Sequence, residues 1–285
     1  MIDTPRKKVL YILGTGHSGS TLLERILATD ASTVSVGGVR YLDKYFRGES
    51  VVATDDTGHA AATSPLWGRM YDTPDRYLAA ATATHTLNTG QKLRLFFGRP
   101  LGAPANFNYQ YLYDDVRQIA SELESREITT VIDSSKTVRS LAEIVSTVAD
   151  EVYVLHLTRD VRGVANSNRR QGMRVLTAAR YWLSDLVYGR VFLWWHVPRS
   201  HRMTVRYEAF VQEPEHWLTR INNVCGIAVD TTDFFSQLDR FPSYRFAGNQ
   251  MRLRPITQLS LDEAWRRELP LWYRWMLAPL NLLRP

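Results

Sequence analysis

The most informative stretch of the sequence for the fold is VLYILGTGHSGST, residues 9–21. Residues 9–13 are short, apolar and followed by glycines, which predicts a buried strand of a parallel sheet. Residues 20–28 repeat leucine and isoleucine at helical spacing, which predicts a helix. A glycine-rich loop that joins a strand to a helix directs backbone N–H groups and the positive end of the helix dipole to one point. The sequence therefore predicts an anion site at this loop, and phosphate is the usual anion.

This stretch resembles two well-known nucleotide-binding loops, but it lacks one residue that each of them requires. Gly14, Gly16 and Gly19 satisfy the dinucleotide pattern G-x-G-x-x-G, but residues 33–40 hold no acidic residue to bind a ribose. The ATP-binding pattern G-x-x-x-x-G-K-[ST] has a lysine where this chain has Ser20, so the clamp on the β- and γ-phosphates is missing. A Rossmann oxidoreductase and a P-loop kinase remain as alternatives that the sequence disfavours.

Strand patterns alternate with helix patterns along the rest of the chain. Further strands are expected at residues 129–132, 152–157 and 201–207. Helices are expected at residues 109–124, 138–149, 162–170, 175–196 and 214–225. This alternation predicts the α/β class, as a three-layer P-loop-like fold with a central, mainly parallel sheet flanked by helices. One domain over residues 1–285 is expected, with 37–106 as a poorly patterned insertion and 260–285 as a helical tail.

Composition excludes several classes of protein. The chain has 285 residues, 45% of them hydrophobic, and a net charge of +6 that comes from 35 basic and 29 acidic side chains. The basic residues form no dense block with interleaved aromatics, so nucleic acid is not an expected partner. Cys225 is the only cysteine, which excludes an intrachain disulfide and a cysteine zinc or iron–sulfur site. A reducing, cytoplasmic location is expected, since no signal-peptide or membrane-spanning stretch is evident.

The glycine loop resembles the 5′-phosphosulfate-binding loop of sulfotransferases that use 3′-phosphoadenosine-5′-phosphosulfate (PAPS). That loop has the form G-x-x-[RK]-S-G-[ST]-[ST]-L, just after the first strand. The matching residues are Gly14, Ser18, Gly19, Ser20, Thr21 and Leu22. His17 stands at the arginine or lysine position, as in bacterial-type members that contain G-H-S-G-S-T. The resemblance extends to the carbohydrate and tyrosylprotein sulfotransferase group.

A second element strengthens the resemblance. Arg159-Asp-Val-Arg-Gly-Val-Ala-Asn-Ser167 fits the family pattern R-D-x-R-x-x-x-x-S, in which the arginine and the serine hold the 3′-phosphate of PAPS. Tyr207, followed by Glu208, is similar to a family tyrosine that lies near the nucleotide. The segment from Gly248 to Arg252 is similar to a late G-N-x-x-R segment expected over the 3′-phosphate.

The resemblance also implies the catalytic residues. Lys136 ends the segment Asp133-Ser-Ser-Lys136 directly after a predicted strand, and it is the only lysine after position 92. Its ammonium is expected to contact the bridging oxygen and the sulfuryl group, and His17 is expected to be the second charge stabiliser. Phosphate and sulfate charges should raise the pKa of His17. A family glutamate that serves as general base is replaced by Gly38, so the base is open among Asp43, His59, His85 or none.

The implied reaction is transfer of a sulfuryl group from PAPS, without a metal, which leaves 3′,5′-adenosine bisphosphate. The acceptor is expected to be a hydroxyl, or as a second option an amine, of a small molecule, carbohydrate or lipid. A nucleotide-binding module without transfer activity is the other alternative, because of His17 and Gly38. Aromatic and basic residues share the tail, which predicts either a helix docked on the domain or a weak membrane-surface contact.

Overall fold

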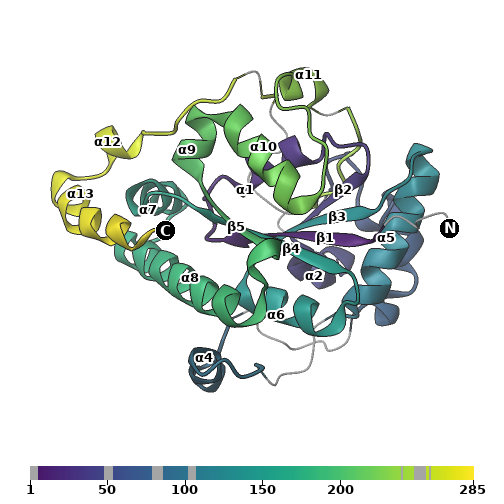
Figure 1. Cartoon of the computed structure of the whole chain (residues 1–285), viewed down its shortest axis with the longest axis horizontal. Coiled ribbons are helices and arrows are strands. Elements are labelled where there is room, and N and C mark those ends of the chain that lie inside the picture. The colour runs from purple at the N-terminus through teal and green to yellow at the C-terminus, as the bar shows by residue number, and fades with distance from the viewer. Residues whose placement is uncertain are drawn as a thin grey trace.

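The computed structural model describes residues 6–47, 54–78, 86–101, 107–238, 240–246, 255–256 and 258–285. Within these residues five strands form one parallel sheet in the order β2-β3-β1-β4-β5 (Figure 1). The strands are β1 (Lys8–Gly14), β2 (Thr33–Gly37), β3 (Thr130–Lys136), β4 (Glu151–Thr158) and β5 (Arg202–Arg206). Because β1 lies between β3 and β4, the loops after these three strands share one edge of the sheet.

Helices cover both faces of the sheet, which makes three layers (Figure 1). One face packs against α1 (Ser20–Leu27), α9 (Tyr207–Gln212) and α10 (Pro214–Cys225). The other face packs against α2 (Leu42–Phe46), α5 (Tyr109–Glu124), α6 (Val138–Thr147) and the end of α8 (Val175–His196). Both faces are therefore buried, as a parallel sheet requires.

The remaining helices are short, apart from α7 (Val161–Arg169), which packs on α8. The insertion contributes α3 (Gly68–Tyr71) and α4 (Thr89–Phe96), and α11 (Phe234–Gln237) follows α10. Single-turn 3-10 helices lie at η1 (Val39–Tyr41), η2 (Ala61–Thr63), η3 (Pro74–Arg76) and η4 (Arg199–His201). The tail forms α12 (Trp265–Glu268), α13 (Leu271–Leu277) and η6 (Ala278–Leu283).

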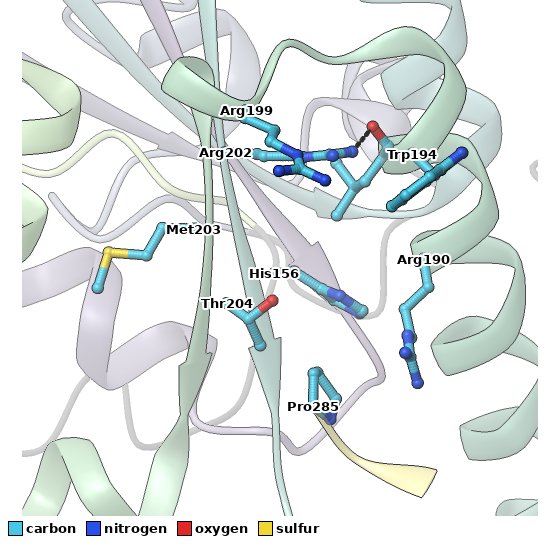
Figure 2. Close-up of a pocket in the computed structure, with 9 residues that line it drawn as sticks. His156, Arg190, Trp194, Arg199, Arg202, Met203, Thr204 and Pro285 are labelled. Atoms are coloured by element: carbon cyan, nitrogen blue, oxygen red, sulfur yellow. Dashed lines mark hydrogen bonds between the residues drawn. The ribbon is translucent and has the colours of Figure 1, made fainter.

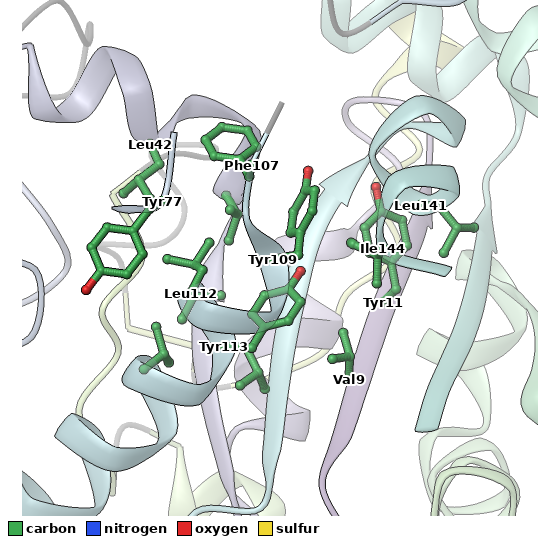
Figure 3. Packing of buried hydrophobic residues seen from close by; sticks show 14 of the residues in the cluster. Val9, Tyr11, Leu42, Tyr77, Phe107, Tyr109, Leu112, Tyr113, Leu141 and Ile144 are labelled. Atoms are coloured by element: carbon green, nitrogen blue, oxygen red, sulfur yellow. The ribbon is translucent and has the colours of Figure 1, made fainter. Parts of the chain in front are cut away.

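The core on the α5 side is rich in tyrosine. Tyr11 of β1 and Tyr109 and Tyr113 of α5 are fully buried, and Figure 3 shows them between strand and helix. Buried tyrosines need partners for their hydroxyls. The Tyr11 hydroxyl donates to the Thr137 carbonyl (2.8 Å), and that of Tyr113 donates to Asp133 Oδ2 (2.7 Å). These bonds hold the end of β3 in a fixed position.

The predicted fold class is confirmed, and so are the four predicted strands, within a few residues at their ends. The sequence did not predict β2, which is the short stretch Thr-Val-Ser-Val-Gly. Its polar members Thr33 and Ser35 break the apolar pattern of a buried strand, yet both are buried. Thr33 bonds to helix-end carbonyls, and Ser35 donates to Glu24, so tertiary partners satisfy these hydroxyls.

The tail docks on α7 and α8 through Trp265, Leu269 and Leu277, which are buried. It forms short helices rather than one long helix. Pro270 precedes α13, and proline lacks the backbone N–H that a continuing helix would need. Among the described helices, none combines the length and apolar character needed to span a bilayer. Cys225 is buried and forms no disulfide.

Candidate active site

Four strands end at the same edge of the sheet and bring the predicted site segments together. The glycine loop follows β1, Asp133–Lys136 ends β3, Arg159 follows β4 and Tyr207 follows β5. The carboxyl edge of a parallel sheet, where the strand order changes direction, is where α/β folds bind ligands. We refer to the region formed by residues 14–21, 133–136, Arg159 and Tyr207 as the donor edge.

The glycines of the β1 loop allow close approaches between backbone and neighbouring groups. A Cβ at Gly14 would lie 2.4 Å from the Leu157 carbonyl oxygen of β4. A Cβ at Gly19 would lie 2.4 Å from Cδ2 of Tyr207, and Gly19 also has a left-handed φ of 96° as the N-cap of α1. Gly16 has open space around it, so the structure does not require glycine there. Ser20 and Thr21 form the first turn of α1.

His17 lies in the same loop in a strained conformation. Its φ is 65°, a left-handed value that costs a side-chain-bearing residue about 1–3 kcal/mol. Arg159 donates to the His17 carbonyl (2.9 Å), which holds the loop against β4. Burial, followed by the Lys136 charge, lowers the pKa of His17, with Arg159 adding to the effect and a Gln171 hydrogen bond opposing it. The neutral ring is thus favoured until an anion is bound beside these cations, which would raise the pKa again.

Lys136 owes its position to an irregularity in β3. Tyr11 pairs with Asp133 while Leu13 pairs with Lys136, so β3 contains one extra residue and bulges. Bulges redirect side chains, and Lys136 has a left-handed φ of 70°. Burial, then the charge of Arg40, lowers the pKa of Lys136 to about 8, with Glu24 opposing the shift. His17, Lys136 and Ser125 are the non-glycine residues with left-handed φ in the described chain, so two of three belong to the predicted catalytic pair.

Arg159 is buried, with 6% of its surface exposed, and both terminal nitrogens of its guanidinium are hydrogen-bonded. One nitrogen bonds the His17 carbonyl, and another bonds the Asp262 carboxylate at 2.9 Å. The guanidinium carbon lies 4.6 Å from the centre of the Tyr207 ring. The anion that Arg159 holds in this structure is therefore a carboxylate from the tail.

Ser167 is half-buried on α7 and shares a helix face with Gly163, four residues earlier. A Cβ at Gly163 would lie 3.0 Å from Nε of Arg159, so the glycine leaves room for the guanidinium over the first turn of α7. This face of α7 therefore presents Ser167 on the side where Arg159 lies. Arg252 lies outside the described residues, as does the segment that surrounds it.

Tyr207 connects three parts of the donor edge. Its ring packs against Gly19 and over Arg159, and its hydroxyl donates to the Ser260 carbonyl (3.4 Å). Burial raises the pKa of this hydroxyl. Tyr207 therefore fixes the positions of the loop and the arginine by packing.

A buried carboxylate that the sequence pattern did not predict lies behind the donor edge. Glu24 of α1 accepts from the Ser35 hydroxyl (2.7 Å) and the Gly37 N–H (2.9 Å) through one oxygen. Its other oxygen accepts from the Ser134 hydroxyl (2.8 Å), in the segment that ends at Lys136. The side chain is 2% exposed. Glu24 thus joins α1, β2 and β3. In the sequence, an acidic residue among the apolar residues of this helix was the feature that could have pointed to it.

A second missed carboxylate faces the loop from α8. Asp185 is half-buried, and its carboxylate hydrogen-bonds the Thr15 side chain of the glycine loop. Burial raises the pKa of Asp185 to about 7, against the charge of Arg40 and the Thr15 hydrogen bond. The charge of Arg40 acts on both Asp185 and Lys136, and the Arg40 N–H donates to the Ser135 hydroxyl (3.1 Å), next to Lys136. Because α8 also contains eleven other polar or aromatic side chains, the sequence offered no signal that selected Asp185.

Two of the three general bases suggested by the sequence lie in the described part of the chain, and both interact with neighbouring residues at the surface. Asp43 pairs with Arg47 on α2 (2.7 Å), and His59 is exposed and shares a hydrogen bond with Thr57 (2.9 Å). His85 lies outside the described residues. A Cβ at Gly38 would lie 3.4 Å from Tyr41 and 3.7 Å from the Ser134 carbonyl, in ordinary contact.

Large apolar side chains of the insertion and of α8 divide into a buried and an exposed group. Trp67, Met70 and Trp182 are buried in the core, and the indole N–H of Trp67 donates to the Tyr244 carbonyl (2.6 Å). Phe96 and Phe97 of α4 are exposed, and Phe96 lies edge-on to Tyr188 of α8, with ring centroids 5.8 Å apart. Of these five residues, only Phe96 and Phe97 have exposed surface to offer a ligand.

The donor edge fits an oxyanion ligand. Among the described residues, the Ser18 hydroxyl, the Thr158 hydroxyl and Nδ1 of His17 are buried without a hydrogen-bond partner. A buried polar group without a partner costs about 1–3 kcal/mol, which a bound ligand would recover. Lys136 and Arg159 supply positive charge beside these groups. Donors and cations of this kind suit phosphate or sulfate oxygens.

Comparison with known proteins agrees with this chemistry. A model of the sulfotransferase family matches residues 10–231, more than half of the chain. The structure is similar to the sulfotransferase domain of the olefin synthase from Synechococcus PCC 7002, with a TM-score of 0.56 and 19% identity over 98% of this chain and 96% of that one. It is also similar to the sulfotransferase domain from the curacin biosynthetic pathway, with a TM-score of 0.54 and 14% identity over 99% and 100%. At these identities the likeness shows the fold. No curated protein matches the sequence.

Proposed function

The chain belongs to the sulfotransferase family, and on that premise we propose that it transfers the sulfuryl group of PAPS to a hydroxyl of a small-molecule, carbohydrate or lipid acceptor. The observation that supports this most is the meeting of His17, Lys136 and Arg159 at one edge of the sheet, beside buried hydroxyls without partners. An amine acceptor is the second option.

We assign the donor to the groups that follow the strands. The loop from Gly14 to Thr21 would bind the 5′-phosphosulfate, with Ser18 as a side-chain donor. Arg159 and Ser167 would bind the 3′-phosphate, and Tyr207 would pack beside the nucleotide. In this structure the Asp262 carboxylate is hydrogen-bonded to Arg159, so the 3′-phosphate must displace it from the guanidinium. A doubly charged phosphate competes well against a single carboxylate for one guanidinium.

Transfer is an in-line displacement at sulfur. The acceptor oxygen forms a bond to sulfur while the bond from sulfur to the bridging phosphate oxygen breaks, and the electron pair stays on the leaving phosphate. Lys136 and His17 would neutralise the charge that develops on the leaving and equatorial oxygens. With a pKa of about 8, Lys136 is still mainly protonated at neutral pH and can donate to the bridging oxygen.

Asp185 is the general base that we propose. A hydroxyl acceptor must lose its proton during transfer, and a base works best when its pKa lies near the working pH. Burial gives Asp185 a pKa of about 7, and its bond to Thr15 places it beside the glycine loop. Tyr188 lies one turn further along α8 and contacts Phe96 of α4, so an apolar acceptor body would find a surface next to the base.

The tail suggests a lipid-facing acceptor surface. Leu271, Trp272, Trp275 and Met276 of α13 are exposed and lie at i, i+1, i+4 and i+5, on one side of the helix. Tryptophan-rich apolar faces bind the interface of a bilayer. We expect liposome flotation to be lost in Trp272→Ala/Trp275→Ala and kept in Trp195→Ala, an exposed tryptophan on α8. If the double variant floats as the wild type does, the proposed membrane contact of α13 is contradicted.

The experiment that tests the function uses sulfur-labelled PAPS and a panel of hydroxylated and amine acceptors. The wild-type chain should transfer label to at least one acceptor, and Lys136→Ala should not. A chain that binds 3′,5′-adenosine bisphosphate but neither transfers nor releases label would be a nucleotide-binding module instead.

A further inference from the structure

A second group of arginines lies outside the donor edge. A cavity of about 380 Å³ lies between the second half of α8, η4 and strands β4 and β5. Its lining includes His156, Arg190, Trp194, Arg199, Arg202 and Thr204, and we refer to it as the arginine pocket (Figure 2). As far as the structure is described, no residue of the glycine loop and neither Lys136 nor Arg159 lines it.

The three guanidiniums of the arginine pocket have no carboxylate partner among the described residues. Arg190 donates to the Leu283 carbonyl (2.9 Å), and Arg202 donates to the Leu193 carbonyl. Arg199 lies 5.7 Å from the centre of the Trp194 ring. Pro285 also lines the cavity. Burial, then the charge of Arg199, lowers the pKa of Arg202, so the two cations lie close enough to act on each other. Such a cluster attracts an anion.

A buried histidine adds a polar group to the same cavity. His156 is 1% exposed, and within the described residues its Nδ1 has no hydrogen-bond partner. Burial, then the charge of Arg190, lowers the pKa of His156 to about 4, so the ring is neutral at physiological pH. A neutral imidazole offers one N–H donor and one acceptor nitrogen. Figure 2 shows the ring between Thr204 and Arg190.

Helix α8 approaches β4 closely at this histidine. A Cβ at Gly189 would lie 3.2 Å from Nε2 of His156 and 3.2 Å from Leu13. A glycine inside a helix costs about 0.5–1 kcal/mol relative to alanine. The fold therefore includes a destabilising residue at the point where the ring must fit beside the pocket.

We propose that the arginine pocket binds a small ligand that presents a phosphate or sulfate ester, at a site separate from the donor edge. The planar fork of arginine matches the oxygens of these groups, and two or three arginines can bind one group together. His156 supplies a neutral partner at the base of the pocket. Trp194 is 63% exposed beside Arg199, which provides an aromatic surface for the organic part of the ligand. The volume suits a small molecule.

The test is a calorimetric titration of the full chain with saturating 3′,5′-adenosine bisphosphate present, so that the donor edge is filled. The probes are inorganic phosphate, inorganic sulfate and phenyl phosphate. Phenyl phosphate should bind with a Kd of about 1 mM or lower. It should bind more tightly than either free ion if Trp194 contributes, whereas equal affinities would identify the ligand as the free ion.

Arg190 and Arg199 are both exposed, so we expect their substitution to leave the fold intact. Arg190→Gln and Arg199→Gln should each weaken phenyl phosphate binding about tenfold, which is about 1.4 kcal/mol. The matched control is Arg220→Gln, whose guanidinium also lies over a tryptophan (Trp217, 4.8 Å) but on α10. It should bind like the wild type. Absence of binding to the wild type, or equal binding in all three variants and the wild type, would overturn the proposal.

Discussion

The donor edge and the arginine pocket both gather positive charge, but they hold it in different ways. Arg159 is buried and is fixed by a carboxylate, a backbone carbonyl and an aromatic ring. Arg190, Arg199 and Arg202 are held by carbonyls and one ring, without a carboxylate among the described residues. A guanidinium fixed in one position can direct a reacting group, whereas a looser cluster can only attract an anion. Chemistry should therefore depend on the donor edge, and the pocket should affect binding of its own ligand.

Loss of Lys136 should produce the largest effect. Removing a group that stabilises transition-state charge in a buried site costs about 10²–10³ in rate, so Lys136→Ala should lower kcat by about that factor. Lys44→Ala, an exposed lysine on α2, should leave kcat unchanged. Steady-state kinetics with PAPS measures both. An equal loss in Lys44→Ala, or a fall in donor affinity alone in Lys136→Ala, would contradict the catalytic role.

Asp185→Asn should lower kcat about 10²-fold, in the range for general bases. In the wild type kcat should rise with pH through about 7 as Asp185 loses its proton, and fall above about 8 as Lys136 does. The rise should vanish in Asp185→Asn, while the fall should vanish in Lys136→Arg. A pH profile of Asp185→Asn that keeps its acidic limb would identify another base.

Asp185→Asn should also change the thermal stability of the protein in a pH-dependent way. Folding raises the pKa of Asp185 from its ordinary 3.8 to about 7, so the folded state prefers the protonated carboxyl. Its contribution to stability is complete below pH about 4 and is lost as pH rises through about 7. Asp185→Asn should therefore gain Tm relative to the wild type at pH 8 and not at pH 4. Thermal unfolding at the two pH values checks this, and equal differences would mean that the carboxyl is not desolvated.

Arg159→Gln should raise the KM for PAPS about 30-fold, because charge-assisted hydrogen bonds contribute about 1.5–3 kcal/mol each. The value of kcat should change less, since the 3′-phosphate lies away from the transferring group. The matched change in the other region is Arg199→Gln, which should leave the KM for PAPS unchanged. A similar rise in both variants would mean that the two regions do not act separately.

Asp262→Asn should have the smallest effect and the opposite sign. The carboxylate competes with phosphate for Arg159, so its removal should tighten binding of 3′,5′-adenosine bisphosphate about threefold, or about 0.6 kcal/mol. Calorimetry measures the change. Weaker binding in Asp262→Asn would show that the carboxylate positions Arg159 for the ligand instead of competing with it.

Local patterns in the sequence predicted most of the donor edge. Strand, glycine loop and helix form one continuous stretch, and Lys136 and Arg159 each follow directly after a strand, so topology alone brings them together. Glu24 and Asp185 could not be predicted in this way. Their importance depends on which helix faces which strand end, and an acidic residue in a helix gives no sign of that. The strand β2 was missed for a similar reason, because Glu24 satisfies one of its polar side chains.

Calorimetric titration of the wild-type chain with 3′,5′-adenosine bisphosphate, ATP and NAD shows whether the glycine loop and Arg159 bind a PAPS-type nucleotide. We expect the bisphosphate to bind with a Kd of about 10 µM or lower, near −7 kcal/mol, and Arg159→Gln to weaken this binding. ATP and NAD should bind at least about 100-fold more weakly, since no lysine follows Gly19 and no acid follows β2 to hold a ribose. Binding of ATP or NAD as tight as that of the bisphosphate, or no binding of the bisphosphate, would contradict this expectation.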